Sequence, residues 1–87
     1  MNSIAIADRA AANLHKAATD FRDGSIEFGR KRVLASMDML AQAGEGAFAQ
    51  RGYAITDYML DMSEVAALVC ERMADEVYAL IEGGHIA

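Results

Sequence analysis

The stretch from Thr56 to Glu82 constrains the fold more than any other part of the chain, because its residues separate by helical period into two opposite faces. Successive residues of an α-helix lie about 100° apart. At that spacing the apolar face consists of Met59, Met62, Ala66, Val69, Met73, Val77 and Leu80. The opposite face carries the acids Asp57, Asp61, Glu64, Glu71, Asp75 and Glu82. The pattern predicts an amphipathic helix over residues 55–82. We expect one continuous rod, and the alternative is two pieces broken near Met62 and Ser63.

A second helical pattern covers residues 4–22, where apolar residues recur every three or four positions. The members of this stripe are Ile4, Ala7, Ala11, Leu14, Ala18 and Phe21. Only three of them are large, so the predicted helix allows a neighbouring helix to approach closely. A turn is expected at Gly24, because glycine tolerates the positive φ angles that tight turns require.

The pattern between these two stretches predicts another helix, over residues 25–43. Gly44 and Gly46 each weaken helix continuation by about 1 kcal/mol relative to alanine, so we expect this helix to end near Ala43. The alternative is an extension through Phe48 to Arg51. Gly52 is the clearer stop before the third helix.

The chain contains no proline, and no stretch alternates at period two, so we predict no strands. Its 87 residues leave room for one domain, residues 1–87. The expected fold is all-α: a small three-helix bundle or helical hairpin with a long C-terminal amphipathic helix, which self-associates. Gly83 and Gly84 end that helix, and residues 85–87 form a flexible tail.

The charge is uneven: the formal net charge is −5, and residues 53–87 hold seven acids and one arginine. A negative field repels nucleic acid and anionic membranes and attracts basic surfaces. The single cysteine cannot form an intramolecular disulfide, which indicates a reducing compartment. The N-terminal residues do not resemble a signal peptide, and no apolar run approaches the roughly 20 residues that span a bilayer. We therefore expect a cytoplasmic protein without membrane contact.

The acidic face of the predicted third helix is the best candidate for a binding site. Two large side chains, Leu68 and Tyr78, lie within it, and an apolar anchor among charges is common at protein interfaces. The predicted partner-binding residues are Asp57, Asp61, Glu64, Leu68, Glu71, Asp75, Tyr78 and Glu82. The alternative interpretation is an ordinary solvated helix face.

A second set of residues is expected at an interface between copies of the chain. Phe28 and Met39 project from a flank of the second helix that its main apolar face does not include. On the third helix, Ser63, Ala67, Cys70 and Ala74 form a ridge of small residues, at which helix backbones can approach closely. We predict an oligomer interface that contains Phe28, Met39, Ser63, Ala67 and Ala74.

The sequence offers no pattern typical of an active site, metal site or cofactor site. Cys70 lies in the small-residue ridge, without a histidine nearby in the sequence to activate it. His15 and His85 are not part of a recurring ligand spacing, and no glycine-rich phosphate loop occurs. We expect no catalytic residue, no metal and no cofactor.

Three functions remain open, none of them enzymatic. The first is a protein-binding module, such as a small inhibitor, whose acidic third helix docks on a basic surface of a partner that handles nucleic acid. The second is a self-assembling structural or adaptor subunit, in which the acids serve only solubility. The third is a small DNA-binding regulator that uses the Arg30–Arg32 run together with Arg22 and Arg51; the negative net charge disfavours it.

Overall fold

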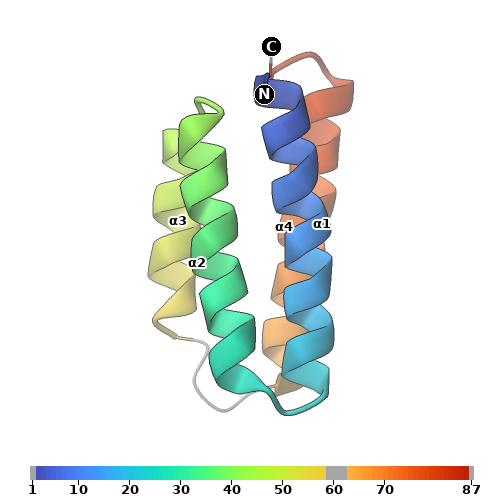
Figure 1. Cartoon of the computed structure of the whole chain (residues 1–87), viewed down its shortest axis with the longest axis vertical. Helices are drawn as coiled ribbons and strands as arrows, with labels where there is room; N and C mark the ends of the chain where they lie inside the picture. Colours follow the sequence, from blue (N-terminus) through green and yellow to red (C-terminus); the bar gives the residue numbers. More distant parts are fainter. Residues whose placement is uncertain (1, 59–62, 87) are drawn as a thin grey trace.

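The protein folds into four helices in the computed structural model, which describes residues 2–58 and 63–86. The helices are α1 (Ser3–Arg22), α2 (Ile26–Gln42), α3 (Gly46–Thr56) and α4 (Ser63–Glu82). α1 packs against both α2 and α4, and α2 also packs against α3, whereas any contact between α3 and α4 is much slighter. In Figure 1 the two ends of the chain lie at the same end of the molecule. The described residues contain no strand, so the prediction of an all-α fold is confirmed.

The central position of α1 follows from its alanines. Its buried residues are Ala7, Ala10, Ala11, Leu14, Ala17, Ala18 and Phe21. Because alanine adds only a methyl group, α2 and α4 can both approach the α1 backbone closely. On α4 the matching buried face is also lined mainly by small residues, among them Ala66, Ala67, Cys70 and Ala74. None of the four helices, as far as they are described, is both long and apolar enough to cross a bilayer.

Polar side chains fix α2 against α1 where alanine contributes little apolar area. Asn13 of α1 donates through Nδ2 to the Ser36 hydroxyl and to the Arg32 carbonyl oxygen, at 3.0 Å in each case. The fully buried Ser36 hydroxyl donates in turn to the Arg32 carbonyl oxygen at 2.7 Å. The Arg32 guanidinium pairs with Asp20 at 2.6 Å. Buried polar groups cost free energy unless they are hydrogen-bonded, and this network satisfies Ser36.

Glycines end α1 and α2, as the sequence indicated. Gly24 and Gly44 have φ angles of 82° and 89°. At each turn the amide of the glycine and the amide after it donate back to carbonyl oxygens of the last helical turn. This is the Schellman arrangement, in which the left-handed residue is nearly always glycine. α2 therefore ends at Gln42, and the alternative of a helix running through to Arg51 is wrong.

The predicted continuous helix over residues 55–82 is wrong. Thr56 is the last residue of α3, and Asp57 and Tyr58 form a turn in which the Tyr58 amide donates to the Ile55 carbonyl oxygen at 2.9 Å. The Thr56 side chain is buried, and its hydroxyl donates to the Gly52 carbonyl oxygen at 2.7 Å. The long pattern thus covers two separate helices, and α4 begins at Ser63, one of the two positions at which the alternative placed a break. The predicted inner residues Met59 and Met62 lie outside the described residues.

Gly52 lies inside α3 and does not end a helix. A Cβ atom at this position would overlap the Met37 side chain, whose sulfur and Cγ lie directly against the Gly52 backbone. Met37 is fully buried. The glycine therefore allows α3 to approach α2, and this tertiary contact offsets the roughly 1 kcal/mol that glycine costs within a helix.

The predicted flexible tail is ordered as far as it is described. Gly84 has a φ of 73°, and the His85 amide donates to the Leu80 carbonyl oxygen at 3.0 Å, so α4 ends in the same turn as α1 and α2. This turn directs Ile86 into the core, where its exposed fraction is 3%. An apolar residue after such a turn commonly packs against its helix, and here it makes residues 85–86 part of the fold.

Candidate functional site

Six of the eight predicted partner-binding residues lie in one stripe along α4. They are Glu64, Leu68, Glu71, Asp75, Tyr78 and Glu82, and their alternating spacing of four and three residues keeps them on one face. At 1.5 Å per residue the stripe is about 27 Å long. We call these six residues the acidic stripe. Asp57 does not belong to it, because it lies at the end of α3. Asp61 lies outside the described residues.

The first half of the acidic stripe is paired with α1. The Arg22 guanidinium contacts Glu64, with Nε 3.3 Å from a carboxylate oxygen, and contacts Glu71 through Nη1. The hydrogen bond that Arg22 donates to Glu71 raises the pKa of Arg22 above its ordinary value. Desolvation opposes this effect, and the hydrogen bond donated to Glu64 adds a smaller increase. One arginine thus faces two carboxylates, and the Glu64 side chain remains 71% exposed. Such exposed pairs are weak and can exchange with a competing cation.

The second half of the stripe is more open. Asp75 and Glu82 are exposed, and within residues 2–58 and 63–86 neither forms an ion pair. The neighbouring Glu76 is also exposed and has no ion pair there. Overall α4 carries five acids and one arginine. Like charges one turn apart, such as Glu71 and Asp75, disfavour the helix by a few tenths of a kcal/mol, and an external cation would remove this cost.

Apolar side chains accompany the acids at the N-terminal end of α4. Leu68 lies within the stripe and is 58% exposed. Val65, one turn earlier, is 47% exposed and was missed by the sequence reasoning. The sequence could have indicated Val65, because it is an apolar residue that fits neither the buried face nor the acidic face of the helix. Together the two side chains give the charged surface an apolar contact point.

Tyr78 differs from the expected exposed anchor, because it already contacts α1. Its ring stacks on His15 with the ring centroids 6.2 Å apart and an interplanar angle of 26°. Tyr78 is half-buried as a result. It can still present one edge to a partner, but Leu68 is the more exposed large side chain of the acidic stripe.

The residues predicted at an oligomer interface do not share one exposed surface. Phe28 is 65% exposed on α2, whereas Met39 is half-buried and packs against the core. Ser63 is half-buried at the start of α4. Ala67 and Ala74 are fully buried within the chain. Because α4 packs chiefly against α1, the close approach expected at Ala67 and Ala74 is made to α1 of the same chain.

The chemistry available at Cys70 is limited by its surroundings. The thiol is fully buried, and desolvation, followed by the nearby charge of Glu71, raises its pKa to about 12. A thiol attacks as the thiolate, so Cys70 is a poor nucleophile near neutral pH. The described residues also include no group of three or more His, Cys, Asp or Glu side chains arranged to hold a metal ion.

The arginines of the nucleic-acid hypothesis are spread over three helices, and several have partners within the chain. Arg22 contacts Glu64 and Glu71, and Arg32 contacts Asp20. The Arg51 guanidinium lies over the Phe48 ring, 5.3 Å from its centroid. Nucleic-acid binding would need these cations to face one phosphate backbone, and this arrangement does not favour it.

Comparisons of the chain with protein-family models, with curated proteins and with solved structures find no match.

Proposed function

We propose that this protein is a non-enzymatic binding module that docks the acidic stripe of α4 on a basic surface of another protein. The observation that carries the proposal is the combination of an exposed leucine with carboxylates that extend along the whole helix. Leu68 is 58% exposed, and Glu71, Asp75 and Glu82 follow it at helical spacing. An ordinary solvated face needs neither the apolar residue nor the uniform sign of charge.

The pairing of Arg22 with Glu64 and Glu71 is consistent with a surface that exchanges cations. Each exposed ion pair contributes about 0.2–1 kcal/mol, so a lysine or arginine of a partner can replace Arg22 at small cost. Asp75 and Glu82 form no ion pair within the described residues, so a partner can bind these carboxylates without displacing a cation. A partner with a row of basic residues would therefore engage the C-terminal half of the stripe first, and Leu68 would add apolar contact.

The test is to neutralise the stripe and measure binding. The variant combines Glu64→Gln, Glu71→Gln, Asp75→Asn and Glu82→Gln. We expect it to remain helical and to lose the protein that the unchanged chain captures from its host lysate. After purification of that partner, titration calorimetry should show affinity about ten- to a hundred-fold lower, since four exposed charge pairs contribute roughly 1–3 kcal/mol together. The affinity of the unchanged chain should also fall as the salt concentration rises.

A matched control removes four acids outside α4. It combines Asp8→Asn, Asp23→Asn, Glu27→Gln and Glu45→Gln, and thus changes the net charge by the same amount. We expect this control to bind the partner within about threefold of the unchanged chain, because the total charge acts mainly on the rate of encounter. Equal affinity of the two neutralised variants would overturn the proposal, as would a partner whose contact surface is acidic.

A further inference from the structure

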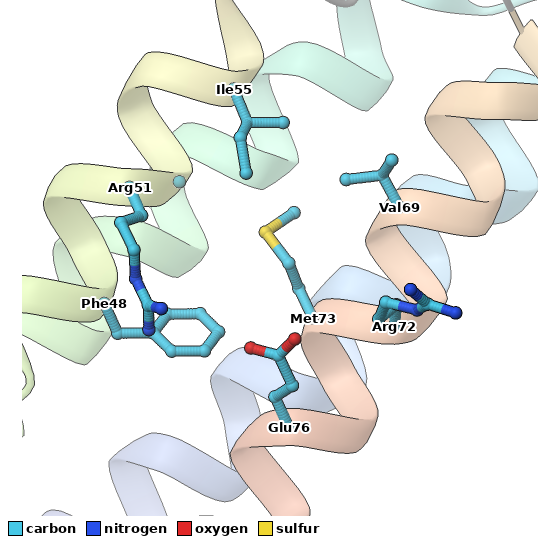
Figure 2. Close-up of a pocket in the computed structure, with 8 residues that line it drawn as sticks. Phe48, Arg51, Ile55, Val69, Arg72, Met73 and Glu76 are labelled. Atoms are coloured by element: carbon cyan, nitrogen blue, oxygen red, sulfur yellow. The ribbon is translucent and has the colours of Figure 1, made fainter.

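A groove opens on the side of the molecule where α3 and α4 are not packed together. It encloses about 240 Å³ and is lined by apolar side chains of both helices. Figure 2 shows Phe48 and Ile55 of α3 and Val69 and Met73 of α4 around this space. Arg51, Arg72 and Glu76 lie at its rim. In a closed four-helix bundle these facing sides would cover each other. Here Phe48 and Met73 are each 5% exposed, whereas Ile55 is 38% exposed and Val69 is half-buried.

The groove and the acidic stripe lie on different faces of α4. At about 100° per residue, Val69, Arg72 and Glu76 fall on the flank toward α3. The acidic stripe falls on the flank toward α1, where Arg22 reaches Glu64 and Glu71. Leu68 adjoins Val69 and Arg72 at the edge between the two surfaces. The acids of the stripe point to the other flank, so a partner that covers the groove leaves them accessible and the two surfaces can be tested separately.

The charges at the rim indicate what covers the groove. Arg51 and Arg72 would repel a basic partner, and Glu76 would repel an acidic one. Arg72 and Glu76 lie one turn apart on the same flank of α4. A surface that carries both signs one turn apart is complementary to itself in an antiparallel pairing, because a two-fold axis brings each residue opposite the other member of the pair. The second copy of this chain is the partner that satisfies both charges.

We infer that the α3–α4 groove is the interface of a two-fold symmetric homodimer, in which the α4 helices of two copies run antiparallel. With the axis level with residue 74, each Arg72 lies opposite the Glu76 of the second copy. In the same register Val69 lies level with Ala79 of the second copy. The exposed parts of Ile55 and Val69 are then covered, and the acids of both acidic stripes remain on the outside of the dimer. This inference goes beyond the proposed function and does not depend on it.

Charge reversal tests the register directly. The full-length chain is measured by sedimentation equilibrium from about 5 to 500 µM, and we expect a reversible dimer. Arg72→Glu should raise the dimer dissociation constant about tenfold or more, because symmetry places two like-charge pairs in the interface. Glu76→Arg should raise the dimer dissociation constant by a similar factor, because it places two pairs of arginines in the interface. The double variant Arg72→Glu with Glu76→Arg should return the dissociation constant to within about threefold of the unchanged chain, because both pairs form again with reversed sign.

Two controls separate this result from a general effect of charge. Lys31→Glu and Glu27→Arg make the same charge changes at exposed positions of α2, and both should leave the dissociation constant within about twofold. The variant with the neutralised acidic stripe should also dimerise normally, even if it has lost its partner. A monomer throughout the concentration range would overturn the inference. So would a dimer that Arg72→Glu and Glu76→Arg leave unchanged, since its interface would then lie elsewhere.

Discussion

The contact between Gly29 of α2 and Phe21 of α1 gives a sharp test of the packing described above. A Cβ atom on Gly29 would lie 2.9 Å from three carbon atoms of the Phe21 ring. The ring is fully buried and cannot turn aside, so α1 and α2 would have to separate by several tenths of an ångström. Overpacking of this kind costs about 1–3 kcal/mol. Alanine recovers about 1 kcal/mol of helix propensity, and since three ring atoms are affected we expect Gly29→Ala to lose about 1–2 kcal/mol.

The assay is urea and thermal unfolding followed by circular dichroism. For a domain of this size 1 kcal/mol corresponds to about 4–8 °C in Tm, so Gly29→Ala should lower Tm by roughly 5–15 °C. Gly46→Ala is the matched control. Gly46 begins α3, and no atom lies within 4 Å of the position that its Cβ would occupy. The same chemical change should therefore leave Tm unchanged or raise it slightly.

A double-mutant cycle identifies the cause of the expected loss. In a Phe21→Leu background the added methyl group of Gly29→Ala meets a smaller and more flexible side chain, so its cost should fall by at least about 1 kcal/mol. The reasoning is refuted if Gly29→Ala is as stable as the unchanged chain. It is also refuted if the cost of Gly29→Ala is the same with phenylalanine and with leucine at position 21.

Three further predictions concern stability. Because burial raises the pKa of Cys70 to about 12 from an ordinary value near 9, only the unfolded chain releases the thiol proton between those values. The unfolding free energy of the unchanged chain should therefore fall with rising pH relative to Cys70→Ala, by up to about 1.4 kcal/mol per pH unit in urea titrations at pH 8 and 10.5. Ile86→Ala should cost about 2 kcal/mol in the same assay, whereas a disordered tail would make it neutral. Arg22→Ala should lower Tm slightly at low salt and have no effect at about 1 M salt, and a loss that persists at high salt would contradict the assignment of its ion pairs as exposed.

The regular parts of the fold could be predicted from periodicity, and the interruption after Thr56 could not. The helical period places residues on faces by their number alone, so it continues through a short turn without a visible break. The two glycines at positions 46 and 52 looked like ends of helices, although Gly46 starts α3 and Gly52 lies within it. The reason is the contact of Gly52 with Met37, a tertiary effect that outweighs local propensity.

The acidic stripe was predicted from residue 64 onward because that part of the pattern is a single helix. Its pairing with Arg22 was not, since the arginine is 42 residues away from Glu64 in the chain and only the packing of α1 on α4 brings them together. Ile86 shows the same limit on a shorter scale. Its burial depends on the turn at Gly84. The sequence indicated that α4 ends there, but it did not indicate that the chain then turns back toward the core.

The small residues of α4 explain both surfaces for which we propose partners. Ala67, Cys70 and Ala74 are fully buried and let α4 approach α1 closely. Val69 and Met73 lie on the flank toward α3, where they line the groove. Met73 is buried, but Val69 is only half-buried, because α3 is a separate helix held chiefly by α2 and leaves the groove open beside it. The carboxylates occupy the other flank, beside α1, where Arg22 is within reach. The close α1–α4 contact thus leaves α4 with two separate flanks, the acidic stripe beside α1 and the groove beside α3, and these are the surfaces to which our two proposals refer.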